Sequence, residues 1–152
     1  MHAIRKAKEY FNQENVEMVV HAGDFSSGFT AQAFEGLTCP LSGVFGECDA
    51  DRQELLESYQ RLNANIQEQL LELQLGDLRL AAIHGTNESI VRALAKSRDY
   101  DFVVRGHDHV AGMTRIGDAL VLNPGEGSGL TTGRTTVAVL KLSERKCTIV
   151  EL

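Results

Sequence analysis

The chain has few cysteines and prolines, and it has no long apolar run. Its three cysteines, Cys39, Cys48 and Cys147, form no CxxC pair, which argues against a disulfide framework and against a thiolate zinc site. They are expected to be core thiols of a protein from a reducing compartment. No apolar run approaches the ~18 residues needed to cross a bilayer, and the N-terminus lacks the apolar core of a signal peptide. We therefore expect a cytoplasmic protein without a membrane partner.

Basic residues are also in the minority. The 152 residues carry 15 Lys and Arg against 21 Asp and Glu, a formal net charge of -6, and no basic cluster stands out. Non-specific binding to nucleic acid or to an anionic membrane has no electrostatic basis in such a chain. An acidic protein of this kind would need metal ions to handle phosphate. Because a chain of this size buries a sufficient core, a metal would serve chemistry rather than folding.

The apolar pattern predicts a single α/β domain over residues 1–152. Helices are expected over about 1–13, 30–34, 51–65 and 88–96, and Asp51 and Glu54 are placed as a capping box at the third. Strands are expected over about 16–22, 41–45, 70–75, 78–83, 102–104, 111–116, 119–122, 135–142 and 147–152. Helices and strands alternate at first and strands then follow one another, which favours packed sheets with helices outside.

Four apolar strands stop at polar residues, which are Asp24, Glu47 with Asp49, His84, and His107 with His109. Ligands gather beyond the carboxyl ends of strands in open α/β sheets, because the loops there converge over a rigid scaffold. Carboxylates and imidazoles are suitable ligands for Mn, Fe, Zn and similar divalent ions. The four placements together predict a metal site at these strand ends.

Each polar residue also has an ordinary structural interpretation. Asp24 is a common type of turn residue or helix cap, Glu47 and Asp49 could be solvated loop charges, and His84 could be a hydrogen-bonded histidine. The coincidence of four such clusters, each beside a glycine, favours the site. His2 and His21 lie outside this set. His2 is expected on the surface of the first helix, and His21 is expected to be a structural histidine within a strand. Two acidic neighbours raise the thiol pKa of Cys48, which disfavours a cysteine nucleophile.

The same residues resemble a known family, the calcineurin-like metallophosphoesterases. The resemblance is greatest to the small archaeal and bacterial phosphodiesterases, a branch that includes the eukaryotic retromer subunit. The matching blocks occur in the family's order and cover almost the whole chain: His21-Ala22-Gly23-Asp24, Gly46-Glu47-Cys48-Asp49, His84-Gly85-Thr86, Gly106-His107-Asp108-His109 and Asn123-Pro124-Gly125.

The resemblance implies a four-layer αββα sandwich and a metal-dependent phosphodiesterase or phosphatase acting on a small phosphoester. Two divalent ions would activate a hydroxide for attack on phosphorus. Mn is the expected metal, with Fe, Zn, Ni and Mg as alternatives. By motif, Asp24 would bridge both ions. His84, His107 and Glu47 would bind one ion and His109 the other, while Asp49, as the catalytic residue, would position a ligand or leaving group.

Two departures from the family pattern modify this expectation. No D-x-H block precedes Gly23, so a sheet without its first strand is expected, from a chain that starts late or from a degenerate member. Glu47 stands where the family has Asn, which affects metal preference and phosphate affinity. A non-catalytic scaffold on the same fold and a single-metal remnant are therefore alternative hypotheses. An exposed sheet edge would favour a homo-oligomer.

Overall fold

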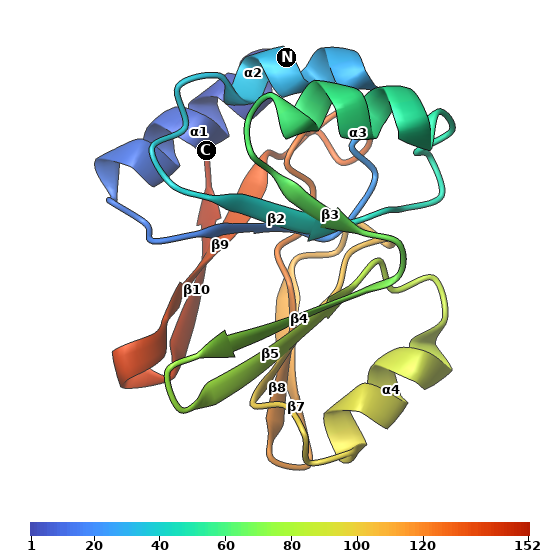
Figure 1. The fold of residues 1–152 in the computed structure, drawn as a ribbon. Helices are drawn as coiled ribbons and strands as arrows, with labels where there is room; N and C mark the ends of the chain where they lie inside the picture. Colours follow the sequence, from blue (N-terminus) through green and yellow to red (C-terminus); the bar gives the residue numbers. More distant parts are fainter.

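The computed structural model describes residues 1–152 as four layers, with β-sheets facing each other between outer helices (Figure 1). The α-helices are α1 (His2–Gln13), α2 (Ala31–Phe34), α3 (Arg52–Gln60) and α4 (Glu88–Lys96), and short 3-10 turns cover Gly28–Thr30 and Leu142–Glu144. The strands are β1 (Val19–His21), β2 (Leu41–Val44), β3 (Asn65–Gln67), β4 (Leu70–Leu75), β5 (Leu78–Ile83), β6 (Phe102–Val104), β7 (Gly112–Ile116), β8 (Ala119–Asn123), β9 (Thr136–Lys141) and β10 (Lys146–Glu151).

A parallel sheet with the order β1-β2-β3 forms one layer, and β9 and β10 form a separate antiparallel pair. Helices α1, α2 and α3 cover the outer face of the three-stranded sheet (Figure 1). Their apolar residues pack against β1 and β2 in a cluster that includes Phe34, Leu41, Leu55 and Tyr59. Strand β1 therefore forms one edge of its sheet, since no ladder joins it to β9 or β10.

The facing layer is a five-stranded mixed sheet with the order β4-β5-β6-β8-β7. Its outer face carries α4, whose Val91 and Ala95 are buried against Val103 and Val121. The central core lies between the two layers and joins residues of β2, β4, β5, β6, β8 and β10, for example Val44, Leu80 and Cys147. Because β5, β6 and β8 run parallel, their carboxyl ends meet on one side of the molecule.

The four-layer α/β prediction is confirmed, and so are most of the elements. The hairpin β4–β5 and helix α4 have the bounds that the sequence pattern predicts. Helix α3 is shorter than expected, because it ends at Gln60 and Asn65–Gln67 form strand β3. Strand β3 exists through its pairing with β2, a long-range contact that local apolar spacing does not reveal.

Two smaller expectations have mixed outcomes. The Asp51 carboxylate accepts a hydrogen bond from the Glu54 amide at 2.9 Å, which confirms the predicted cap of α3. Of the three cysteines expected in the core, Cys147 is buried and Cys39 is partly buried, but Cys48 is exposed. The expectation was wrong for Cys48 because this residue lies in a strand-end loop rather than in a packed element.

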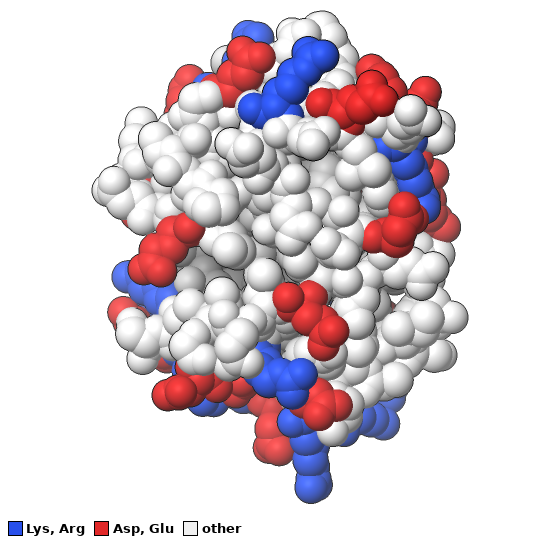
Figure 2. All heavy atoms as spheres, in the orientation of Figure 1, with Lys and Arg blue, Asp and Glu red and all other residues white.

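The surface carries no concentrated basic region on the face that Figure 2 shows. Lysine and arginine side chains lie interspersed with aspartate and glutamate around a largely uncharged centre. None of the helices combines the length and apolar character that a bilayer span requires.

Candidate metal centre

The loop after β1 brings Asp24 to the strand ends. Gly23 and Asp24 both adopt positive φ, 99° and 60°, so the chain turns sharply as it leaves the sheet. The Gly23 amide donates to His21 Nδ1 at 3.2 Å, and the His21 ring stacks on Phe25 with centroids 4.0 Å apart. Burial lowers the pKa of His21 to about 4, so this histidine is a neutral structural support, as the sequence predicts.

The buried Asp49 carboxylate joins the loops that follow β1 and β2. Its oxygens accept three backbone N–H groups, from Asp24 at 3.1 Å, Ser26 at 2.8 Å and Gly46 at 2.7 Å. Asp24 Oδ1 in turn accepts the Cys48 amide at 2.9 Å. A Cβ at Gly46 would overlap the Asp24 carboxylate, so only glycine permits this close approach. The position of Asp24 is therefore fixed by backbone contacts on both loops.

His84 lies at the end of β5 and is only 8% exposed. Its Nδ1 lies 2.8 Å from the Ala22 carbonyl oxygen, which can only accept, so Nδ1 carries the proton and donates. In the neutral imidazole Nε2 then has a free lone pair. This Nε2 is buried without a hydrogen-bond partner and lies 3.6 Å from Asp24 Oδ2.

Glu47 and His107 complete the group around His84. His107 Nδ1 lies 3.1 Å from Glu47 Oε2, and the His84 and His107 ring centroids are 5.4 Å apart. Ligand atoms of Glu47, His84 and His107 all lie within 4.8 Å of one another. One carboxylate and two imidazoles at such distances form a suitable donor set for a divalent ion.

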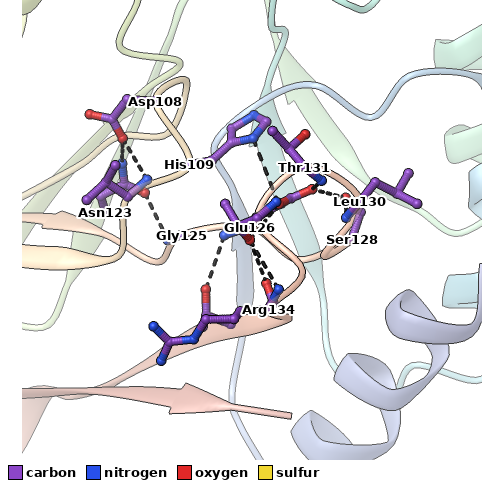
Figure 3. A network of polar contacts seen from close by, with 12 residues as sticks. Asp108, His109, Asn123, Gly125, Glu126, Ser128, Leu130, Thr131 and Arg134 are labelled. Atoms are coloured by element: carbon purple, nitrogen blue, oxygen red, sulfur yellow. Dashed lines mark hydrogen bonds and ion pairs between the residues drawn. The ribbon is translucent and has the colours of Figure 1, made fainter.

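His109 does not belong to the group of Glu47, His84 and His107. Its Nδ1 is 4.0 Å from Oε2 of Glu126, a buried residue of the loop after β8 (Figure 3). Glu126 is not among the site residues that the sequence predicts, because it is an isolated acidic residue in a glycine-rich stretch. The available signal was local: Ser128, Thr131 and Thr132 follow a lone acidic residue and could all donate to it.

Backbone strain is concentrated in these loops. Asp24, Ser26, His107 and His109 all have φ between 60° and 74°, a region that non-glycine residues seldom occupy. Such conformations cost on the order of 1–3 kcal/mol each and persist where the surrounding structure holds them. Here the hydrogen bonds of Asp49 hold the backbone amides of Asp24 and Ser26.

The residues present fit a divalent cation. The Nε2 of His84 is buried and has no hydrogen-bond partner in the protein, and with Nδ1 donating to the Ala22 carbonyl it can offer a lone pair to a cation. Asp24 and Glu47 place carboxylate oxygens nearby, and no Lys or Arg forms an ion pair with either of them. Cys48 is not a candidate nucleophile, because its pKa is raised. The Asp24 carboxylate has the largest effect on this pKa, and partial desolvation and the other acidic neighbours add to it.

The structure thus brings together some of the predicted residues and separates others. Glu47, His84 and His107 form one group, Asp24 adjoins it through His84, and Asp49 lies beneath as a buried anchor. His109 faces Glu126 instead of this group.

Known proteins resemble this chain in sequence over almost its whole length. The model of the calcineurin-like phosphoesterase superfamily domain matches residues 1–145. Phosphodiesterase MJ0936 of Methanocaldococcus jannaschii is 38% identical over 144 residues, covering 94% of this chain and 87% of that protein.

Solved structures share the fold. An archaeal phosphodiesterase superposes with a TM-score of 0.93 at 36% identity, covering 99% of this chain and 92% of the other. The Vps29 protein of Entamoeba histolytica, in complex with zinc, has a TM-score of 0.65 at 16% identity, with 94% and 86% of the two chains covered. At that identity the second likeness concerns the fold alone.

Proposed function

The chain belongs to the calcineurin-like phosphoesterase superfamily and is a hydrolase acting on phosphoester bonds, and from this premise we propose that it is a metal-dependent phosphodiesterase or phosphatase. The proposed metal ligands are Asp24, Glu47, His84, His107 and His109, and Asp49 is the proposed positioning residue. Mn is the proposed ion.

The buried lone pair of His84 carries this proposal. Its Nδ1–H is held by the Ala22 carbonyl, and its Nε2 has no partner among the protein's own donors. A buried polar atom without a partner costs about 1–3 kcal/mol. That cost is offset when a cation binds between Nε2 and the Asp24 carboxylate, 3.6 Å away. The geometry therefore supports a cation ligand better than a purely structural histidine.

The remaining side chains prepare the same position. Asp24 is oriented through Oδ1 by the Cys48 amide, which leaves Oδ2 on the side of His84. The exposed carboxylate of Glu47 lies against His107 and can turn toward an ion without losing a buried contact. Asp49 acts through the loops, because its three amide contacts set where Asp24 stands.

The acidic character of this centre defines what an ion contributes. A phosphoester approaching Asp24 and Glu47 meets negative charge, so these residues alone would repel it. Bound divalent ions supply the positive charge that holds a phosphate and lower the pKa of water near it.

The proposed substrate is a small phosphoester, and the proposed location is the cytoplasm. The net charge of -6 disfavours long nucleic acids as substrates. Three free cysteines suit a reducing compartment.

The test is hydrolysis of bis(p-nitrophenyl) phosphate by the purified chain loaded with Mn. Asp24→Asn and His84→Ala should each lower the rate by more than ~100-fold, beyond the loss expected for an outer-shell residue. Asp77→Asn, in the exposed β4–β5 turn, is the matched control and should retain the wild-type rate. Metal analysis of the same samples should find two ions per chain, and a single ion would support the one-metal variant of the site. The proposal fails if wild type and Asp24→Asn hydrolyse the diester equally slowly.

A further inference from the structure

Glu126 is the most completely hydrogen-bonded carboxylate near the centre. The residue is 6% exposed, in the loop between β8 and β9. Its Oε1 accepts from the Ser128 hydroxyl at 2.6 Å and the Thr131 amide at 2.9 Å. Its Oε2 accepts from the amide and the hydroxyl of Thr132, both at 2.8 Å. Four donors thus fix both oxygens, and Figure 3 shows the loop wrapped around this one side chain.

The backbone of Glu126 is fixed as firmly as its side chain. Its amide donates to the Thr136 hydroxyl at 3.1 Å, and its carbonyl accepts the Thr136 amide at 2.9 Å. Because Thr136 is buried at the start of β9, these bonds tie the loop to a regular strand. The carboxylate is therefore held in one place with respect to the fold.

This carboxylate is directed at His109. Four N–H and O–H donors, from Ser128, Thr131 and Thr132, point at its two oxygens, an arrangement that favours the ionised carboxylate. A fixed negative charge consequently lies 4.0 Å from His109 Nδ1. Such a charge favours the imidazole orientation and tautomer in which Nδ1 carries a proton.

A second link joins the same two loops next to His109. Asn123 Nδ2 donates to Asp108 Oδ1 at 2.6 Å, and that oxygen also accepts the Val110 amide at 2.9 Å. His109, with φ of 61°, lies between Asp108 and Val110 in the chain. Its strained backbone is therefore held by Asp108, and its ring lies against Glu126 (Figure 3).

We infer that Glu126 is a positioning residue that sets the ring orientation and tautomer of His109, so that Nε2 is the nitrogen left for a ligand. The inference rests on the proposed function, in which His109 binds a metal ion. It assigns Glu126 no ligand role of its own, because four donors already occupy its two oxygens. At 4.0 Å the contact between His109 Nδ1 and Glu126 Oε2 is electrostatic, and a carboxylate beside the second nitrogen of a ligating histidine commonly fixes its tautomer and ring orientation.

The test is the nitrogen-15 NMR spectrum of the histidine side chains in the full, metal-free chain. Wild type is expected to show His109 protonated at Nδ1 with Nε2 unprotonated. In Glu126→Ala that preference should be lost, so that the two tautomers exchange. Glu126→Gln, which keeps the volume but removes the charge, should shift the populations in the same direction and serves if the alanine variant does not fold.

Matched controls separate positioning of His109 from simple stabilisation of the loop. Ser128→Ala and Thr132→Val each remove a side-chain donor to the carboxylate but leave its charge in place. Both should keep the His109 tautomer of wild type. A wild-type His109 protonated at Nε2, or a tautomer that Glu126→Gln and Glu126→Ala leave unchanged, would overturn the inference.

Metal binding then distinguishes this inference from the proposed function. Titration of the folded chain with Mn should show that Glu126→Gln weakens one binding event by roughly 10- to 100-fold. Equal Mn affinity in wild type and Glu126→Gln would also overturn the inference. Failure of the wild type to hydrolyse a phosphodiester overturns the proposed function instead, and leaves the metal-free tautomer result valid.

Discussion

His84 and Glu126 are both buried and polar, yet they stand at opposite extremes of hydrogen bonding. His84 Nε2 has no hydrogen-bond partner, whereas both Glu126 oxygens are filled by four donors. Residue type does not explain the different roles of these two residues, since imidazole and carboxylate are both metal ligands. The number of free lone pairs explains them, because an acceptor that is already hydrogen-bonded stabilises the fold, whereas a free lone pair is available to a ligand.

Asp49 and Glu47 repeat the contrast within one loop. Asp49 is 3% exposed and accepts three backbone amides, whereas Glu47 is exposed and its carboxylate contacts only the His107 ring, with Oε2 3.1 Å from Nδ1. The filled acceptors, Asp49 and Glu126, should thus determine stability without metal. The open ones, Glu47 and His84, should determine the response to metal.

The largest stability effect is expected for Asp49→Asn in the metal-free chain. Hydrogen bonds to a charged group are worth about 1.5–3 kcal/mol, and the amide replaces one accepting oxygen with a donor that faces backbone N–H groups. The free energy of unfolding should fall by about 2–3 kcal/mol in urea denaturation. Asp77→Asn is the control and should leave the urea midpoint unchanged. A neutral Asp49→Asn would remove the distinction between anchors and ligands.

A somewhat smaller and pH-dependent effect is expected for Glu126→Gln. The folded pKa of Glu126 is about 2, below its ordinary value of 4.5. The unfolded chain therefore binds more protons in this window, so the stabilisation is complete above about pH 4.5 and is lost as pH falls toward 2. Wild type should exceed Glu126→Gln in stability by about 2 kcal/mol at pH 7 and by less at pH 3. A difference that does not depend on pH would mean that the charge of Glu126 contributes nothing.

The smallest effect is expected for Glu47→Gln without metal. Exposed substitutions of this kind usually change stability by less than about 0.5 kcal/mol. The thermal stabilisation produced by added Mn should nevertheless shrink, because ligand-induced stability follows the affinity of the folded state. Melting curves with and without Mn measure both quantities. An equal Mn-induced shift of the melting temperature in Glu47→Gln and wild type would show that Glu47 is not a metal ligand.

Much of this architecture is predictable from local sequence pattern. Long periodic segments such as Glu88–Lys96 and the β4–β5 hairpin have the predicted bounds, because hydrophobic periodicity is strongest there. Strand β3 was not predicted, because three residues are too few to establish a period of two. Its pairing with β2 is a long-range contact, which local pattern does not encode.

The candidate site shows the same division between local and long-range information. Glycines and polar residues at strand ends predicted that Glu47, His84 and His107 would meet, and their ligand atoms do lie within 4.8 Å. The difference between Asp49 and Glu47 was not predictable, since it depends on which amides from a distant loop reach each carboxylate. Glu126 was missed because its partners are arranged by the loop's own folding around it.

The left-handed backbone at Asp24, His107 and His109 also limits which replacements make a clean chemical probe. Asparagine, aspartate and histidine adopt this conformation several-fold more readily than other non-glycine residues, and they are also donors of metal-binding atoms or close mimics of them. A substitution to a β-branched residue would disturb the turn as well as the chemistry, and the two effects could not be separated. Asparagine scanning of these turns therefore changes the side-chain chemistry with less disturbance of the backbone than substitution by a β-branched residue. Aspartate and histidine both adopt the left-handed turn and offer metal-binding atoms, so the same residue types meet the backbone requirement and the chemical one.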